Sequence, residues 1–404
     1  LVAALTRWLL PPPRTELAVR RAQHAEHSHE GDLALGFTLE ERIARVAATL
    51  ESIGLTSGVA PIVVALGHGA SSVNNPHRSA YDCGACGGDG GGPNARAFAA
   101  MANDPEVRVG LCARGIEIPD GTWFIGGLHD TTTDAIELFD LDLVPGPLHR
   151  ELTALREALD SARALSAHER CRRFEHATGA TDPGAALAHV EERAVDLSQA
   201  RPELGHATIA WCFVGRRALT RGLFLDRRAF LISYDPAADP QGETLERILA
   251  AAMPVGAGIS LEYFFSSVDP DAWGSGTKLP HNLAALLGVM EGTSGDLRTG
   301  LPRQMTEIHE PQRLLCVIEA TPATIMAIAA RQPGVAELVQ NGWVSLACVD
   351  PASGAIDVLE AGELRRWEPE HRPLPIVGHS REWYAGKPGF LGPARIEPLP
   401  SKAA

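Results

Sequence analysis

The chain has 404 residues, and its balance of residue types is that of a folded globular protein. Hydrophobic residues make up 45% and charged residues 21%, which argues against a disordered chain. Lys and Arg number 36 against 50 Asp and Glu, a formal net charge of −14. This acidic surplus argues against a nucleic-acid-binding protein, which needs a basic face. The length suggests two or three domains, or one large α/β body with insertions.

Apolar runs in the sequence are too short or too interrupted to predict a membrane-spanning helix. Leu1 to Leu10 is apolar but short, and Arg7 interrupts it. Ile248 to Leu261 is free of charge but holds Pro254 and two glycines. Both runs fall short of about 20 consecutive apolar residues. Seven cysteines, scattered except for Cys83 and Cys86, favour a reduced cytosolic compartment over a disulfide framework.

The first 147 residues read as a helical segment followed by a strand and a Gly-rich loop. Residues 1–59 are predicted as a helical lead-in, in which Thr38 suits an N-cap and Glu41 completes a capping box. Residues 60–147 form a second unit. Its predicted elements are a buried strand at 60–66, a Gly-rich stretch at 71–93, a helix at 94–103, a strand at 122–125 and a short helical segment opened by Thr131.

The remaining residues predict an α/β body with a helical insertion. Residues 148–200 are rich in Ala, Leu, Glu and Arg and predict two helices. Residues 201–368 form the α/β remainder, with strands at 207–214 and 229–234, a helix at 242–252, and a strand–helix–strand unit at 314–318, 321–331 and 343–349. Such a unit usually pairs its strands in parallel. Residues 369–404 contain many prolines and predict an extended tail.

The chemistry-bearing residues gather in the Gly-rich stretch. His68 follows an apolar strand, and ligand sites in open α/β sheets lie beside the carboxyl ends of strands. Cys83 and Cys86 follow in a loop whose glycines allow close backbone approach. Imidazole and thiolate are donors that zinc prefers. A hydrogen-bonded structural His and a redox Cys pair are the alternatives for these residues.

Other segments resemble functional motifs less closely. Residues 274–278 look like a phosphate loop but lack its spacing. Cys348-Val349-Asp350 has the form of a zinc pair but is better interpreted as a strand end and a turn. His129-Asp130 suits either a helix cap or an anion contact at a helix N-terminus. The remaining residues of this kind, interpreted as solvated histidines and incidental or buried thiols, are His27, His29, Cys112, Cys171, Cys212 and Cys316.

Several motifs together resemble one family. Gly67-His68-Gly69, Asn74-Asn75-Pro76 and the run from Asp82 to Gly88 closely resemble DabA, the zinc-binding subunit of the DAB inorganic-carbon transporter. Further agreement lies in residues 92–96, 201–203, 234–236, 274–278 and 295–302. The resemblance covers roughly residues 35–350, and the chain looks like the C-terminal half of the family's polypeptide.

The resemblance implies a zinc core similar to that of β-type carbonic anhydrases, in a mostly parallel sheet with helical insertions. In the family, zinc is held by a Cys and an Asp from a Cys-x-Asp-x-Arg segment, a His and a second Cys. His68 matches the family's His and Cys83 its second Cys, with Cys86 the nearest rival. The Cys-x-Asp-x-Arg segment is not found in this sequence.

The function implied by the resemblance is energy-coupled hydration of CO2 to bicarbonate by hydroxide generated at Zn2+. The implied partner is DabB, a multi-pass membrane subunit, and the implied location is peripheral on the cytoplasmic face of the cell membrane. Enzymatic activity is expected only in the intact protein with that partner. Two alternatives stay open: a non-catalytic, zinc-stabilised assembly subunit, and a soluble β-type carbonic anhydrase.

Overall fold

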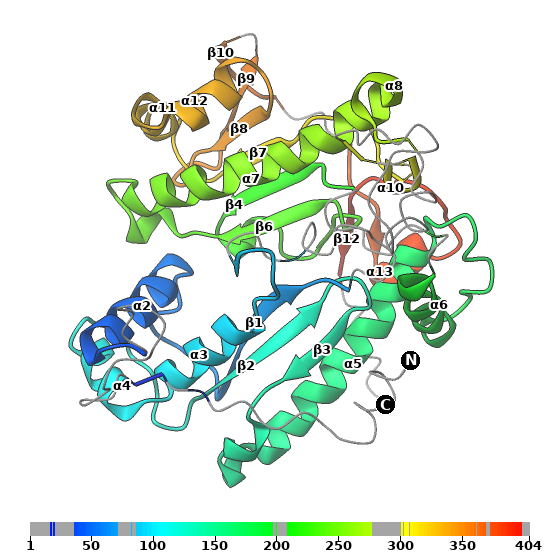
Figure 1. Cartoon of the computed structure of the whole chain (residues 1–404). Helices are drawn as coiled ribbons and strands as arrows, with labels where there is room; N and C mark the ends of the chain where they lie inside the picture. The colour runs from blue at the N-terminus through cyan, green and yellow to red at the C-terminus, as the bar shows by residue number, and fades with distance from the viewer. Residues whose placement is uncertain are drawn as a thin grey trace, which may run out of the picture.

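The structure is a computed structural model that describes residues 17, 19–20, 36–71, 82, 86–196, 199, 208–276, 300–301, 303–306, 308–360, 362–368 and 372–397. These residues form three sheets with helices packed on them, which confirms a mixed α/β chain (Figure 1). The likeness to a carbonic anhydrase core stays a prediction.

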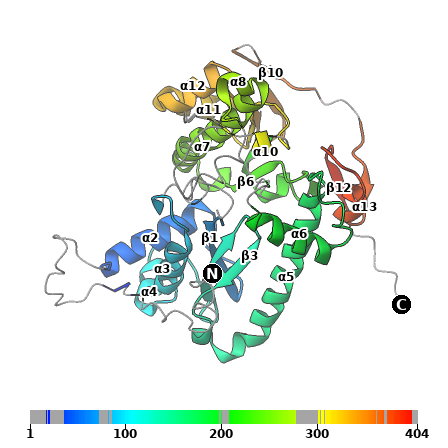
Figure 2. The ribbon, with the colours of Figure 1, turned by 45° about the vertical axis from the view of Figure 1, so that its right-hand side comes forward.

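The first sheet carries His68 and has helices on both faces. Its strands are β1 (Ile62–Gly69), β2 (Trp123–Asp130) and β3 (Ala135–Leu138). β1 and β2 run parallel, and β2 and β3 run antiparallel. One face is covered by α2 (Leu39–Ser52), α3 (Gly92–Ala102) and α4 (Pro105–Cys112), and the other by α5 (His149–Cys171), as Figure 2 shows.

Helix α2 begins where its sequence predicts. The Thr38 side chain accepts a hydrogen bond from the Glu41 backbone, and the Glu41 carboxylate accepts one from the Thr38 backbone. This capping box satisfies two amide groups that the first turn leaves without partners. Val46 and Leu50 then lie on the buried face of the helix. The helical lead-in is thus described from Leu39 to Ser52, and most of residues 1–35 lie outside the described part.

The short helix predicted after Thr131 is wrong. The chain makes a tight turn there and returns as β3 beside β2. Asp134 sits in the turn with φ +57°, a left-handed conformation that Asp tolerates better than most residues. The spacing of Thr131 and Asp134 therefore belongs to a reversal of the chain and not to a helix cap.

The second sheet has the order β10-β9-β8-β7-β4-β6. Its strands are β4 (Trp211–Gly215), β6 (Ala229–Ser233), β7 (Leu315–Ile318), β8 (Ser345–Val349), β9 (Ile356–Glu360) and β10 (Glu363–Arg366). The four from β6 to β8 are parallel, and β9 and β10 add antiparallel pairs at one edge. This arrangement confirms the predicted strand–helix–strand unit, because β7 and β8 pair in parallel.

Three helices bury the largest apolar core against one face of this sheet. They are α7 (Glu243–Val268), α11 (Pro322–Arg331) and α12 (Pro333–Gln340). By length and composition alone, helix α7 could cross a membrane, a property that it shares with core helices of soluble proteins, so the prediction of no membrane-spanning segment stays a prediction. The helix continues through Pro254 to Val268. Leu245 and Leu249 face the core, whereas Val255 is 62% exposed.

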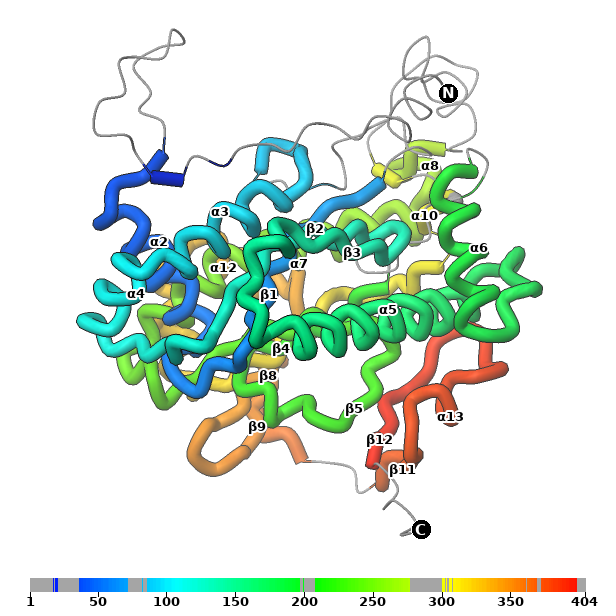
Figure 3. Tube along the Cα trace, turned by 90° about the horizontal axis from the view of Figure 1, so that it is seen from below, coloured from blue at the N-terminus to red at the C-terminus, as the bar shows by residue number. Residues whose placement is uncertain are grey.

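Within residues 372–397, the described part of the C-terminal tail, the chain forms two short strands and a helix and not only the extended segment predicted. These elements are β11 (Ile376–Val377), α13 (Ser380–Tyr384) and β12 (Ala394–Ile396). β12 pairs antiparallel with β5 (Leu223–Phe224), and Tyr384 is 2% exposed. Figure 3 shows this tail beside α5 and α6 (Pro183–Val195), the two helices predicted for residues 148–200. The short helices α8 (Pro270–Trp273) and α10 (Arg303–Thr306) complete the described helices.

Candidate metal centre

His68 lies inside β1, one residue before the strand ends, and not beyond its end as predicted. Its partner in the parallel register is His129 on β2. Strands paired in a sheet lie about 4.8 Å apart, and residues in register point to the same face. His129 shares this face with Ile125, which packs against α5. Two imidazoles therefore stand side by side near the carboxyl ends of two parallel strands, on the α5 side of the sheet.

Glycines bring the loop before α3 into contact with the end of β1. The Gly91 amide donates to the His68 carbonyl oxygen at 2.7 Å. A Cβ on Gly67 would overlap the backbone of Gly91, so no larger residue fits there without movement. Gly126 on β2 meets α3 in the same way, because a Cβ there would lie 2.6 Å from the Arg96 Cα. The described glycines at 90–92 therefore pack directly on the strands that carry the two histidines.

Residues on both sides of Cys83 are held near this edge. The Asp82 carboxylate accepts a hydrogen bond at 2.9 Å from the amide of Ala70, the residue after β1. The Cys86 sulfur accepts one at 3.2 Å from Asn94 on α3. Cys83 itself lies outside the described residues. Cys86 is thus hydrogen-bonded to a side chain of α3, and this contact gives it a role in holding the loop on the helix.

Asp130 fixes the first residues after β1. It accepts hydrogen bonds from the Ser71 amide at 3.0 Å, from the Ser71 hydroxyl and from the Thr132 amide at 3.0 Å. Burial acts to raise the pKa of Asp130, but these hydrogen bonds outweigh it and lower the pKa below its ordinary value. The carboxylate is therefore ionised at neutral pH and already occupied by donors.

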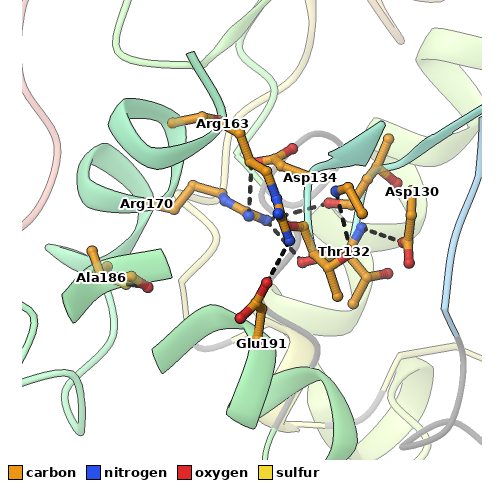
Figure 4. A network of polar contacts seen from close by, with 12 residues as sticks. Asp130, Thr132, Asp134, Arg163, Arg170, Ala186 and Glu191 are labelled. Carbon is orange, nitrogen blue, oxygen red and sulfur yellow. Dashed lines mark hydrogen bonds and ion pairs between the residues drawn. The ribbon is translucent and has the colours of Figure 1, made fainter. Parts of the chain in front are cut away.

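A buried ion-pair network orients His129. The His129 Nε2 lies 3.0 Å from one oxygen of Asp134, and Arg170 of α5 donates to the other at 2.8 Å. Burial acts to raise the pKa of Asp134, but the His129 hydrogen bond and the charge of Arg170 lower it to about 2. Figure 4 shows Arg170 reaching from α5 to the turn, with Arg163 bonded to Glu191 of α6 beside it. The network joins β2, α5 and α6.

This network was missed by the sequence interpretation of His129-Asp130. No helix begins after Asp130, so neither the helix cap nor the anion contact at a helix N-terminus holds. The sequence did hold a sign of this contact, because His129 and Asp134 flank a run of threonines. That spacing suits a tight turn closed by a carboxylate–imidazole hydrogen bond.

The other cysteines behave as structural thiols. Cys348 is the penultimate residue of β8, and Asp350 after the strand accepts hydrogen bonds from the Ala352 and Ser353 amides, so the strand end and turn interpretation is confirmed. Burial raises the pKa of Cys171 and of Cys212, each to about 11. Both stay protonated at neutral pH and are poor metal ligands.

The described residues supply only part of a metal site. Among them, no group of three or more His, Cys, Asp and Glu side chains is arranged to hold a metal ion. His68 has the donor chemistry that zinc accepts, and Ala70, two residues after it, donates its amide to the Asp82 carboxylate. The residues present fit a zinc site to which other segments contribute further ligands.

Comparison with known proteins gives the family. A family model described as "Probable inorganic carbon transporter subunit DabA" matches residues 1–344. The chain belongs to the DabA family. It is 62% identical over 97% of its length to DabA 1 of Sorangium cellulosum, and 51% identical over 98% of its length to DabA of Methylococcus capsulatus.

The DabA relatives are much longer than this chain. The match covers 38% of the Sorangium cellulosum protein and 37% of the Methylococcus capsulatus protein. The chain thus spans less than two fifths of the length of these curated relatives. No solved structure matches the chain. The names of these relatives describe a probable inorganic carbon transporter subunit.

Proposed function

We propose that this chain is part of a zinc-binding subunit that hydrates CO2 to bicarbonate during inorganic carbon uptake. One observation carries the proposal: Asp82, directly before Cys83, is hydrogen-bonded to Ala70, two residues after His68. This contact supports His68 and Cys83 as two ligands of one zinc ion. The Cys-x-Asp-x-Arg segment of the family's longer polypeptide would complete the set.

The chain's own residues would hold and shape this site. Bound zinc would supply hydroxide near neutral pH by lowering the pKa of water to about 7. His68 would be held in position by its strand and by the Gly91 amide on its carbonyl oxygen. Asp130 and Asp134 already bind donors, so neither is available as a ligand without breaking those bonds. The two ligands from this chain are therefore an imidazole and a thiolate.

The proposed partner is a DabB-like multi-pass membrane subunit, with this chain peripheral on the cytoplasmic side. The names of the relatives, which describe a transporter subunit, support a membrane-associated complex. Helix α7 is the only described helix that is long and apolar enough to span a bilayer, and its core-facing side packs on the second sheet. We assign α7 to that core.

Uptake in cells tests the proposal. The intact protein and its membrane partner are expressed in cells that lack carbonic anhydrase, and the accumulation of labelled bicarbonate is measured. Accumulation should rise with both subunits and not with either alone. Unchanged accumulation with both subunits present and folded would contradict the proposal.

Ligand identity has its own test. Removing one ligand commonly destroys a zinc site, so His68→Ala and Cys83→Ala should each lose bound zinc. Cys86→Ala is the matched control and should keep its bound zinc, because the Cys86 sulfur already accepts a hydrogen bond from Asn94. Zinc content per polypeptide is measured on the intact protein by elemental analysis. Loss of zinc in Cys86→Ala alone would reverse the assignment of the second ligand.

A non-catalytic role is the second candidate, because hydrogen bonds from Ala70 to Asp82 and from Gly91 to His68 already tie both ends of the loop to β1. Zinc would then only clamp the Gly-rich loop for assembly. Exchange of labelled oxygen between CO2 and water separates the two roles, since a structural clamp gives none. A soluble carbonic anhydrase would show this exchange without any partner.

A further inference from the structure

A cavity of about 370 Å³ lies where the C-terminal tail meets the helical insertion. Its walls come from the carboxyl end of α5, the loop between α5 and α6, and the tail from Arg381 to Pro388. None of these elements carries His68. The volume lies at the lower end of the roughly 300–1,000 Å³ found for small-molecule sites.

The cavity is lined by positive charge in an acidic protein. Arg172, Arg381 and Lys387 line it, and none of the described lining residues is an Asp or Glu. The chain as a whole carries a formal net charge of −14. The lining of this cavity is therefore positively charged although the protein as a whole is acidic. A positively charged lining attracts anions.

One of the three cations is already used to hold the tail. Arg172 is paired with the buried carboxylate of Asp226, and it donates to the carbonyl oxygens of Lys387 and Gly389. Arg381 and Lys387 differ from it. Neither forms an ion pair with a carboxylate in the described part of the chain, and the Lys387 ammonium lies 3.8 Å from the centroid of the Trp383 ring. Two positive charges are left for a ligand.

The floor of the cavity is neutral. The Tyr384 hydroxyl and His168 Nδ1 lie 3.2 Å apart, and the ring of His168 also hydrogen-bonds the Thr181 backbone. Burial, and after it the charge of Arg381, lower the pKa of His168, so the imidazole is uncharged at neutral pH. Arg381 lines the cavity together with His168 and Tyr384. Asp182 acts on His168 in the opposite sense and Glu169 acts on Tyr384, but neither carboxylate forms an ion pair with Arg381 or Lys387 among the described residues.

We propose that this cavity binds a small phosphate monoester, with Arg381 and Lys387 on the phosphate group. The arginine fork matches two phosphate oxygens, and lysine acts as a point charge. The positive charges of Arg381 and Lys387, neither of which is ion-paired with a carboxylate among the described residues, match a dianion. The apolar walls of Ala177, Ala180 and Pro388 leave room for an organic part that inorganic phosphate lacks.

Calorimetric titration of the full chain tests this site, with glycerol 3-phosphate, inorganic phosphate and glycerol as the three probes. Glycerol 3-phosphate should bind saturably, inorganic phosphate more weakly, and glycerol not at all. The double variant R381Q/K387Q should lower the affinity for glycerol 3-phosphate at least tenfold. The matched control R365Q, at an exposed arginine of β10, should leave it unchanged.

A second variant fills the cavity without changing its charge. Ala180→Leu should weaken binding of glycerol 3-phosphate while preserving that of inorganic phosphate. The thermal unfolding midpoints of all ligand-free variants are compared with that of the parent to confirm folding. Absence of glycerol 3-phosphate binding, or equal affinity in R381Q/K387Q, would overturn the site. Equal affinity for inorganic phosphate would overturn the assignment of an ester.

Discussion

The carboxylate of Asp134 contacts two side chains, a histidine beside the candidate metal centre and a buried arginine. It bonds His129 on the strand that neighbours His68, and it pairs with Arg170, whose side chain is fully buried. An arginine at that depth needs a counter-charge, because an unpaired buried charge is costly. The turn after β2, the orientation of His129 and the position of α5 all depend on this carboxylate.

Asp134→Asn should therefore destabilise the fold by about 3–5 kcal/mol, since it leaves Arg170 without its counter-ion. Chemical denaturation at pH 7 measures the change. Glu363→Gln is the matched control: its pair with Arg365 on β10 is exposed, and its loss should cost less than about 1 kcal/mol. An equal effect of the two substitutions would contradict the role given to Asp134.

The same carboxylate predicts an acid dependence of stability. Folding lowers the pKa of Asp134 from 3.8 to about 2. Its contribution to stability is thus fully present above pH 4 and is lost as the pH falls toward 2. The stability difference between the parent protein and Asp134→Asn should shrink over that interval, as measured by denaturation at several pH values.

At the scale of elements, the candidate metal centre depends on how closely a loop approaches a strand. The Gly-rich segment lies on β1 because Gly67 and Gly91 leave no side chains between the two backbones. The Gly91 amide then bonds the His68 carbonyl oxygen, and α3 begins at the next residue. Strand, loop and helix form one unit, so displacing the loop disturbs the surroundings of His68.

Gly67→Ala should displace this loop, because its new methyl group would overlap the backbone of Gly91. We expect a loss of about 1–3 kcal/mol in the free energy of unfolding, as for an overpacked core, and weaker zinc binding in the intact protein. Gly121→Ala is the matched control, since no atom lies within 4 Å of a Cβ there. Unchanged stability and zinc content in Gly67→Ala would show that the contact is dispensable.

At the scale of the whole molecule, the C-terminal tail joins parts that are far apart in sequence. Tyr384 is buried, stacks on Phe224 with ring centroids 6.2 Å apart, and contacts His168 of α5. Arg172, directly after α5, donates to tail carbonyl oxygens, and Leu391 donates its amide to Asp226. The tail thus connects the carboxyl end of α5 with the loop between β5 and β6. It also forms one wall of the cavity lined by Arg172, Arg381 and Lys387.

Tyr384→Ala should loosen this attachment. Removing a large buried aromatic side chain costs about 3–5 kcal/mol, and the tail should become cleavable by protease under native conditions. Limited proteolysis and chemical denaturation measure the two effects. Trp367→Ala, at a residue 47% exposed, is the control and should change stability by less than about 1 kcal/mol. A protease-resistant tail in Tyr384→Ala would contradict its role.

The sequence by itself determined the features that depend on near neighbours in the chain. The capping box of α2 needs only Thr38 and Glu41, and the parallel pair β7 and β8 follows from a strand–helix–strand pattern. Hydrogen bonds and apolar periodicity within a few residues decide both. The family motifs around His68 are likewise readable along the chain.

The tertiary structure decided what depends on distant partners. The turn at Asp134 forms because Arg170 lies on its far side, and α7 buries one face because the second sheet covers it. The tail folds because β5 and α5 accept it. Likewise, His129 stands beside His68 only through strand pairing across 61 residues. Such contacts join residues whose separation along the chain carries no local signal, so no pattern within one segment reveals them.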